Sequence, residues 1–311
     1  MTQTPVAPHE HAEWLVCGAS VTGSLHEQRG LGCDDAYGYG VVGDFVVAAV
    51  ADGAGSVTGT SAWGSYAACQ SILLNAMQPR FIHDFHTAPG EYAETLMRWL
   101  FDCAVQRVAD QAEAMRVEVS RLSTTLCVAL AHREAAFFGQ VGDGVIATEH
   151  DDRIETVLIE PKDDYANTTW FIQSDAAFEE SYRTVMQKGV TAFALSTDGM
   201  SYKITNVATG EAYEPFFRGS WQQVRSGASA DNFAALLRGI EDDQTGDDKT
   251  MVLAALPQPG ESSGLMRPVV SCSAAPGEAA VAAGQPSEPE TDPLQAGSRR
   301  RRRWMRARKP K

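Results

Sequence analysis

Short apolar runs rich in β-branched and aromatic residues recur along the chain and predict strands. These runs cover residues 13–23, 37–51, 123–132, 134–142, 153–159, 190–197 and 250–256. Three other segments, residues 60–77, 92–119 and 231–240, have the apolar spacing of helices instead. Because the helices interrupt the strands without alternating with them, the pattern predicts an α+β fold, with helices packed outside mainly antiparallel sheets.

The chain divides by composition into four parts. Residues 1–12 are predicted to be a flexible leader, and residues 13–256 a globular domain that is long enough to bury a large core. Residues 257–297 are rich in Pro, Ala, Gly, Ser and Glu, which bury too little apolar surface to order a chain, so they predict a flexible linker. Residues 298–311 form a basic tail, SRRRRRWMRARKPK.

Charge is unevenly distributed between the tail and the rest of the chain. The whole sequence has a net charge of −14, yet its last fourteen residues hold seven Arg and two Lys and no acid. The remaining 17 basic and 40 acidic residues give the rest of the chain a charge of −23. Such an acidic body binds phosphate polymers poorly unless metal ions intervene. The tail has several interpretations: contact with an acidic protein, a lipid or a nucleic acid, folding back on the acidic body, or solvation alone.

The six cysteines are scattered, without a C-x-x-C pair or the spacing of a zinc finger. This pattern favours a reducing compartment over a disulfide framework. The first residues, MTQTPVAPHEHAEW, lack the basic and apolar regions of a signal peptide. No apolar run approaches the roughly 18 residues that a membrane span needs. We therefore expect no transmembrane segment and a soluble, cytoplasmic protein.

Carboxylates stand at the ends of several of the predicted strands. They are Asp34, Asp35, Asp52, Asp143, Asp198, Asp247 and Asp248. An Asp-Gly pair, as at 52–53, 143–144 and 198–199, is by itself typical of a turn. Strands packed side by side, however, bring their ends together, and several carboxylates at one rim repel one another unless a cation lies between them. The pattern therefore favours a site for a hard divalent cation such as Mg²⁺.

These carboxylates lie within motifs that together resemble those of a known enzyme family. The motifs are GSLHEQRGLGCDDAYGY at 23–39, VADGAGS at 50–56, STTLCVAL at 123–130, FFGQVGDG at 137–144, FALSTDGM at 193–200 and GDDKTMVL at 246–253. In this order and spacing they resemble the motifs of the metal-dependent protein phosphatases, the protein phosphatase 2C family, over about residues 14–256. The opening motif and DDYANTTWF at 163–171 are similar to a bacterial subgroup.

The resemblance implies a four-layer α-β-β-α sandwich, in which helices flank two antiparallel sheets. It also implies a site for two Mg²⁺ or Mn²⁺ ions at the sheet ends, with a third, weaker ion in many members. The residues that match the family's metal ligands are Asp35, Asp52, Asp143, Asp198, Asp247 and, through its carbonyl, Gly53. Asp52 matches the carboxylate that bridges the two ions, and Asp143 matches a ligand of the third. Asp34 and Asp248 are expected beside the ligands and not on an ion.

The implied activity is hydrolysis of phosphoserine and phosphothreonine by a water that bridges two divalent cations, with Asp52 and Asp198 as catalytic residues. A phosphorylated protein is the implied substrate, and a cognate Ser/Thr kinase and a von Willebrand-type A domain protein are the implied partners. Two other functions stay open: a non-catalytic phosphoprotein-binding module with the same fold, and a metal-dependent hydrolase of small phosphoesters.

The sequence departs from the family's pattern at a few positions near the expected site. Asp34 replaces a Gln of the subgroup, and it either strengthens a water-mediated metal contact or is a surface residue. His26 matches a His of the subgroup, and Arg29 lies near the position of a phosphate-binding Arg. Both are predicted to bind phosphate, while Arg29 also fits a solvated surface charge. Ala54 stands where some members have a His general acid.

Overall fold

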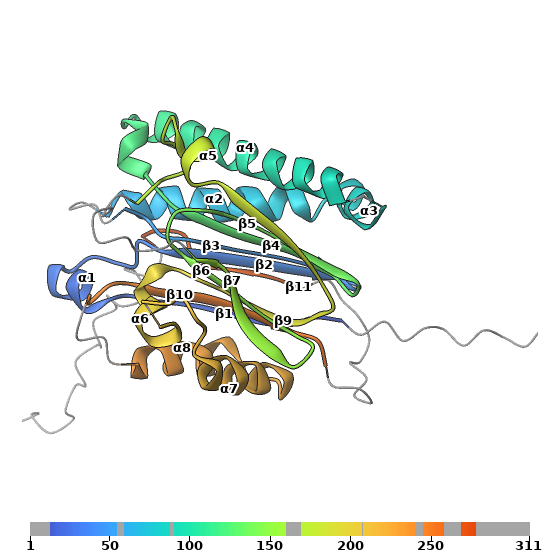
Figure 1. The fold of residues 1–311 in the computed structure, drawn as a ribbon. Coiled ribbons are helices and arrows are strands. Elements are labelled where there is room, and N and C mark those ends of the chain that lie inside the picture. Colours follow the sequence, from blue (N-terminus) through green and yellow to red (C-terminus); the bar gives the residue numbers. More distant parts are fainter. Residues whose placement is uncertain are drawn as a thin grey trace, which may run out of the picture.

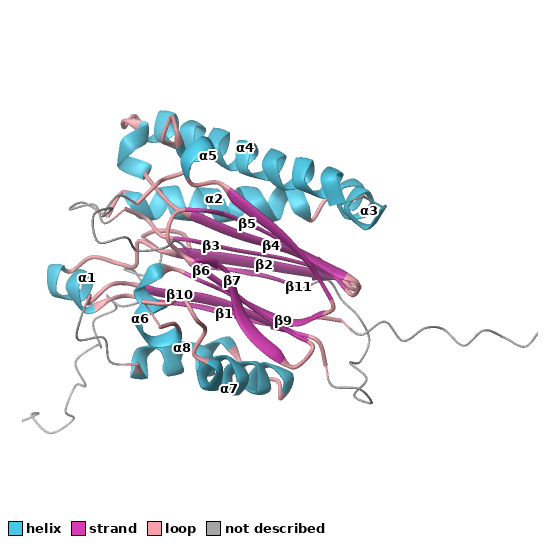
Figure 2. Cartoon of the chain, in the orientation of Figure 1, coloured by secondary structure: helices cyan, strands magenta, loops and turns pink. Residues whose placement is uncertain are grey.

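The computed structural model describes residues 13–54, 59–87, 90–159, 169–206, 208–240, 245–257 and 269–277. The predicted leader and basic tail lie outside these residues, as does most of the predicted linker. In the described part, two antiparallel sheets stack face to face, and helices cover the outer face of each sheet (Figures 1 and 2). This four-layer arrangement confirms the predicted fold class.

Within the described residues, one sheet has five strands in the order β1-β10-β9-β6-β7, and the other has six in the order β11-β2-β3-β4-β5-β8. We call them the β10 sheet and the β3 sheet. The strands of the β10 sheet are β1 (Leu15–Val21), β10 (Lys249–Ala255), β9 (Val190–Ser196), β6 (Val145–His150) and β7 (Arg153–Ile159). Those of the β3 sheet are β11 (Val269–Cys272), β2 (Ala36–Val42), β3 (Phe45–Ala51), β4 (Leu126–His132), β5 (Ala135–Val141) and β8 (Arg183–Lys188).

Helices form the two outer layers (Figure 1). The β3 sheet is covered by α2 (Ser61–Ala76), α3 (Pro79–Thr87), α4 (Gly90–Met115) and the short α5 (Ala177–Glu180). The β10 sheet is covered by α7 (Glu214–Arg225) and α8 (Ala230–Gly239). The connections contain α1 (Ser24–Arg29), α6 (Ser201–Ile204) and the 3-10 helices η1 (Val119–Leu122) and η2 (Asp198–Met200). Across the part of the chain described by the structure, no helix combines the length and the apolar character that crossing a membrane requires.

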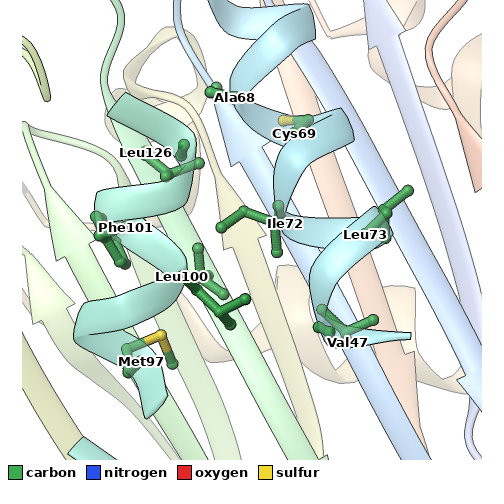
Figure 3. Close-up of a cluster of buried hydrophobic side chains, with 14 of the residues drawn as sticks. Val47, Ala68, Cys69, Ile72, Leu73, Met97, Leu100, Phe101 and Leu126 are labelled. Atoms are coloured by element: carbon green, nitrogen blue, oxygen red, sulfur yellow. The ribbon is translucent and has the colours of Figure 1, made fainter. Parts of the chain in front are cut away.

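The largest apolar cluster lies between the β3 sheet and the helices α2 and α4. Ile72 of α2 and Leu100 and Phe101 of α4 are completely buried there, close to Val47 of β3 (Figure 3). Full burial of a side chain of this size stabilises a fold by about 1.5–3 kcal/mol. Because β3 packs against helices on one face and against the other sheet on its opposite face, all of its residues are buried.

Two further clusters fill the remaining layers of the sandwich. Between the sheets, the rings of Phe138 and Phe193 meet edge to face with their centroids 5.7 Å apart. On the outer face of the β10 sheet, Trp221 of α7 is completely buried. Its Nε1 donates a hydrogen bond of 3.0 Å to the carbonyl of Phe193. The strands in the middle of both sheets are therefore covered on each face, which explains their nearly continuous apolar sequences.

The predicted strands and helices are present, and the structure adds elements that the sequence pattern did not reveal. The run at 37–51 forms the hairpin of β2 and β3, and its turn contains Gly43 with a φ of +62°. The unpredicted elements include β6, β8, α1, α3 and α7. In α7, the buried residues Phe217, Trp221 and Val224 recur at helical spacing. They would have indicated this helix.

One strand lies in the segment that the sequence predicts to be a linker. Residues 269–272 form β11, which pairs antiparallel with β2 at the edge of the β3 sheet. The prediction of a structureless linker is therefore wrong for these residues. Their sequence, VVSC, begins with two β-branched residues that favour a strand. The run is too short to stand out from flanks rich in Pro, Ala and Gly.

Candidate metal centre

The carboxylates of the β3 sheet lie at the end of the sandwich that carries α1 and α6, on the left in Figure 1. Ala36 at the start of β2 pairs with Ala51 at the end of β3. Asp35 directly precedes β2 and Asp52 directly follows β3, so the two residues lie next to this pair. The antiparallel hairpin brings together two carboxylates that are well separated in sequence.

The β10 sheet supplies carboxylates to the same end of the sandwich. Ser196, the last residue of β9, pairs with Met251 near the start of β10. Asp198 follows β9 directly, and Asp247 precedes β10. Asp143 lies in the connection that leaves β5 of the β3 sheet and enters β6 of the β10 sheet. Both sheets thus contribute acidic side chains to one site.

Asp52, Asp143 and Asp198 form the centre of the site. Each offers one carboxylate oxygen, and these three oxygens lie within 4.8 Å of one another. All three residues are half-buried. Carboxylates at this separation repel one another, and a cation between them removes that repulsion. The fold thus brings together three of the residues that the sequence predicts to hold metal.

Two threonines of the connection before β4 fix the backbone at Asp52. The N–H of Asp52 donates a hydrogen bond of 3.0 Å to Oγ1 of Thr125. The carbonyl of Asp52 accepts hydrogen bonds of 2.9 Å from the N–H of Thr125 and from Oγ1 of Thr124. Both backbone groups of Asp52 are therefore held, which fixes the point from which its side chain leaves the backbone.

Gly53 lies where three backbone segments approach closely. It is buried and pairs with Thr124 in an isolated bridge. A Cβ at this position would lie 2.5 Å from the carbonyl oxygen of Asp34 and 2.9 Å from the carbonyl carbon of Ser61. Backbone atoms cannot turn aside as a flexible side chain does, so the close approach requires glycine.

Asp35 is buried next to Asp52, and its Oδ2 accepts a hydrogen bond of 2.7 Å from Oγ1 of Thr197. Burial, followed by the charge of Asp248, raises the pKa of Asp35 well above its usual range. Burial, followed by the charges of Asp35 and Asp198, raises the pKa of Asp52 in the same way. A bound cation opposes both shifts, because positive charge favours the ionised carboxyl group.

Asp248 ties three segments together behind these carboxylates. Its Oδ1 accepts a hydrogen bond of 2.6 Å from the N–H of Gly23. Its Oδ2 accepts one of 2.6 Å from the N–H of Asp34 and lies 2.9 Å from Nδ1 of His26. His26 and Asp248 are both buried. Asp248 therefore joins α1 and the loop before β2 to the start of β10.

Asp34 is buried, with 2% of its surface exposed, so its interpretation as a surface residue is wrong. Oγ of Ser61 donates a hydrogen bond of 2.6 Å to Oδ2 of Asp34. Oγ of Ser65 donates one of 2.5 Å to the carbonyl of Asp34. Both serines belong to the first turns of α2, where a negative charge is also favourable for the helix dipole. Asp34 thus anchors α2 to the loop that carries Asp35.

The other predicted residues lie around this set. Oδ2 of Asp143 accepts a hydrogen bond of 3.1 Å from Oγ1 of Thr169. Asp247 is half-buried, and its Oδ1 accepts a hydrogen bond of 2.9 Å from the N–H of the next residue. Arg29 is exposed in the last turn of α1. Its contact with phosphate stays a prediction.

Sequence reasoning missed the hydroxyl groups that hold the acidic residues in place, some at the carboxylate and some at the backbone. These belong to Ser61, Ser65, Thr124, Thr125, Thr169 and Thr197. Some of them had a signal, because 123–125 reads STT and 196–198 reads STD. A hydroxyl can donate or accept a hydrogen bond, so such residues within the motifs suit the support of an acidic residue, although the partner of Thr197 is Asp35 and not its neighbour Asp198.

A sequence profile described as Protein phosphatase 2C matches residues 22–238, which is more than half of the chain. The chain belongs to the protein phosphatase 2C family. This membership confirms the resemblance carried by the motifs. The matched region includes Asp35, Asp52, Asp143 and Asp198 and ends before Asp247. None of the curated proteins matches the chain at a significant level.

Solved structures of bacterial phosphatases share the protein phosphatase 2C fold of this chain. A bacterial serine phosphatase has a TM-score of 0.55 and 15% identity, over 80% of this chain and 99% of its own. A bacterial serine phosphatase with an Arg-to-Ala substitution has a TM-score of 0.52 and 17% identity, over 79% of this chain and 99% of its own. At these identities the likeness shows the fold of two antiparallel sheets flanked by helices.

Protein phosphatase 2C enzymes use divalent metal ions, and the residues at this site fit such ions. The cluster of Asp52, Asp143 and Asp198 offers oxygen donors only. A donor set of carboxylate oxygens is typical of hard divalent cations such as Mg²⁺ and Mn²⁺. The raised pKa of Asp52 is the second fitting feature, since a cation stabilises its charged form.

Proposed function

We propose that this protein is a metal-dependent serine/threonine protein phosphatase. The observation that carries the proposal is the meeting of Asp52, Asp143 and Asp198, whose carboxylate oxygens lie within 4.8 Å of one another in a protein phosphatase 2C fold. Gathering these charges in a half-buried place costs folding free energy. A function that depends on bound cations explains why the protein keeps a cluster with this cost.

Two divalent cations, Mg²⁺ or Mn²⁺, are proposed to bind at this cluster, with a third, weaker ion beside them. The proposed ligands are Asp35, Asp52, Asp143, Asp198, Asp247 and the carbonyl of Gly53. Asp52 is proposed to lie between the two ions, because it adjoins Asp35 on one side and the other two carboxylates of the cluster on another. When bound, such ions activate a water and offset the charge of the phosphate.

The chain's own part in the reaction is to hold the ligands in position. Thr125 fixes the backbone of Asp52, and Thr197 fixes the carboxylate of Asp35. Correct orientation of reacting groups removes much of the entropic part of a barrier. Arg29, exposed on α1, is proposed to contact the phosphate dianion. His26, which was predicted with Arg29 to bind phosphate, is buried against Asp248, so we propose instead that it acts by positioning that carboxylate.

Phosphoserine and phosphothreonine side chains of a protein are the proposed substrates. The two similar solved structures are serine phosphatases, which supports this substrate class. Cys33, the cysteine that lies two residues before Asp35, is no good competing nucleophile: burial, followed by the charge of Asp35, raises its pKa well above the usual range. A thiol with a raised pKa is a poor nucleophile at neutral pH. This supports attack by water.

A reducing compartment, the cytoplasm, is the proposed location. All six cysteines are free thiols, which fits such a compartment. A cognate Ser/Thr kinase is proposed as the enzyme that makes the substrate, because the phosphorylated protein on which such a phosphatase acts is the product of a kinase.

Hydrolysis of a phosphothreonine peptide by the purified full chain tests the proposal. Phosphate release is measured with Mn²⁺, with Mg²⁺ and with EDTA. Asp52→Asn and Asp198→Asn are expected to lower metal-dependent release by at least about 100-fold, since each removes a charged ligand. Asp102→Asn is the matched control, because Asp102 is an exposed carboxylate that pairs with Arg98 on α4.

The outcomes separate the candidate functions. Metal-dependent turnover of the peptide, lost in both site variants and kept in Asp102→Asn, supports the phosphatase. Turnover of a small phosphoester with none of the peptide would favour the small-phosphoester hydrolase. Metal binding without turnover of either substrate would favour the binding module, and a lack of metal binding would overturn the site.

A further inference from the structure

The residue that follows β11 holds the start of β2. The N–H of Tyr37 donates a hydrogen bond of 2.7 Å to Oγ of Ser273. The N–H of Ser273 donates one of 3.0 Å to the carbonyl of Tyr37. Tyr37 comes two residues after Asp35 in the sequence. Ser273 therefore fixes both backbone groups of a residue directly beyond the acidic loop.

A second path leads from Ser273 to Asp35 through the β10 sheet. Oγ of Ser273 lies 3.4 Å from Oγ of Ser20 on β1, which accepts a hydrogen bond of 2.8 Å from Oγ1 of Thr250 on β10. The N–H of Thr250 donates a hydrogen bond of 3.2 Å to Oγ1 of Thr197. Oγ1 of Thr197 donates one of 2.7 Å to Oδ2 of Asp35. Polar contacts, joined through Thr250 itself, thus connect Ser273 to Asp35.

The segment around Ser273 also forms part of a cavity next to this path. The cavity has a volume of about 620 Å³, and its lining includes residues 272–277 and residues 30–37. Residues of β1, α2 and α8 also line it. The segment after β11 and the loop that carries Asp35 therefore line the same cavity, in addition to the hydrogen bonds between Ser273 and Tyr37.

We propose that Ser273 is a positioning residue for Asp35, so that residues 269–277 belong to the frame of the metal site. The inference rests on the proposed function, in which Asp35 is a metal ligand. Ser273 touches neither cation nor substrate and acts through Tyr37 and the hydroxyl path. Removing its Oγ leaves the N–H of Tyr37 without its acceptor, which loosens the start of β2. A loosened Asp35 binds metal less tightly.

Direct measurement of Mn²⁺ binding to the full chain tests this role. Titration followed by electron paramagnetic resonance of free Mn²⁺ gives the affinity independently of catalysis. Ser273→Ala is expected to bind Mn²⁺ about fivefold more weakly than the wild type, the effect of about one hydrogen bond. Ser273→Thr keeps the hydroxyl and is expected to restore the affinity.

Thr148→Ala is the matched control for a purely structural effect. Thr148 is a buried residue of β6, and its Oγ1 donates a hydrogen bond of 2.7 Å to Oε1 of Gln187. Neither residue belongs to the two paths that connect Ser273 to Asp35. Its loss is expected to lower the free energy of unfolding about as much as Ser273→Ala does and to leave Mn²⁺ affinity unchanged. Urea unfolding of each variant provides the comparison.

The possible results are distinct. Weaker binding in Ser273→Ala, restored in Ser273→Thr and absent in Thr148→Ala, supports the positioning role. Equal affinity of Ser273→Ala and the wild type overturns it and leaves the proposed function intact. A loss shared by Thr148→Ala overturns it as well, because the effect then follows stability. A wild-type chain that binds no Mn²⁺ overturns the proposed function itself.

Discussion

Nδ1 of His26 lies 2.9 Å from Oδ2 of Asp248, in a contact between residues that are 222 positions apart. Only 7% of the surface of His26 and 2% of that of Asp248 is exposed. The same carboxylate accepts the backbone N–H groups of Gly23 and Asp34. A single buried acid therefore connects α1, the loop before β2 and the start of β10, which are the segments around the candidate metal site.

Replacement of His26 tests this connection. His26→Ala is expected to lower the free energy of unfolding by about 1–3 kcal/mol, because it removes a partner from a buried carboxylate. Arg29→Ala, an exposed change on the same helix, is expected to stay within about 0.5 kcal/mol of the wild type. Urea denaturation followed by circular dichroism measures both. Equal stability of the two variants would contradict the structural role of His26.

Gly53 offers a test of the close backbone approach at the site. Gly53→Ala is expected to destabilise the fold by about 2–4 kcal/mol, because rigid backbone atoms leave no room for a Cβ. The nearest such atom, the carbonyl oxygen of Asp34, would lie 2.5 Å away.

Gly32→Ala is the matched control for this substitution. A Cβ at Gly32 meets nothing within 4 Å, so a change within about 0.5 kcal/mol is expected there. Thermal unfolding of the two variants decides the matter, and similar midpoints would refute the packing argument.

The carboxylates of the site can be predicted from the sequence, because their positions depend on local patterns. Asp52 and Asp198 each follow an apolar run and precede a glycine, which identifies a strand end without any knowledge of the tertiary fold. The order of the motifs indicates the family, and the family indicates the layers. Fold class and acidic cluster therefore both follow from short stretches of sequence.

The partners of these carboxylates could not be predicted in the same way. The contact of Ser273 with Tyr37 joins residues 236 positions apart, and β11 exists only because β2 offers it an edge. Likewise, Asp34 is buried because α2 places Ser61 and Ser65 beside it. Long-range packing decides such contacts, and local sequence patterns do not reveal which distant residues will meet.

His132 gives the fold a sensitivity to acid away from the carboxylate cluster. Its ring stacks on that of His86 with the centroids 5.0 Å apart, and its Nδ1 accepts the N–H of Glu134. Burial, followed by the charge of His86, lowers the pKa of His132. The folded state therefore binds fewer protons than the unfolded state, whose His pKa is about 6.5. Stability is complete above that pH and falls as the pH drops through it toward the folded pKa.

Replacement of His132 should remove this part of the acid sensitivity. His132→Gln carries no titrating group, so its free energy of unfolding is expected to fall less steeply than that of the wild type between about pH 7 and pH 5. Urea denaturation at a series of pH values measures both slopes. His83→Gln, in which an exposed His on α3 is replaced, serves as the control. Parallel curves for His132→Gln and the wild type would rule out the effect.

Asp52→Asn separates the cost of the acidic cluster from its use. Burial and the charges of Asp35 and Asp198 raise the pKa of Asp52, so its ionised form opposes folding as the pH rises through the folded pKa. With EDTA at pH 7, the uncharged Asn is therefore expected to stabilise the protein by about 1–2 kcal/mol, as removal of strain from a functional site often does. With Mn²⁺ the order is expected to reverse, since a ligand at 100 times its Kd adds about 2.7 kcal/mol to the wild type alone. Urea denaturation of the wild type and of Asp52→Asn, each with EDTA and with Mn²⁺, gives the four free energies of unfolding. The control Asp102→Asn should match the wild type under both conditions. A variant less stable than the wild type in EDTA would mean that hydrogen bonds to the Asp52 carboxylate outweigh the repulsion, and that the cluster is a structural feature of the fold.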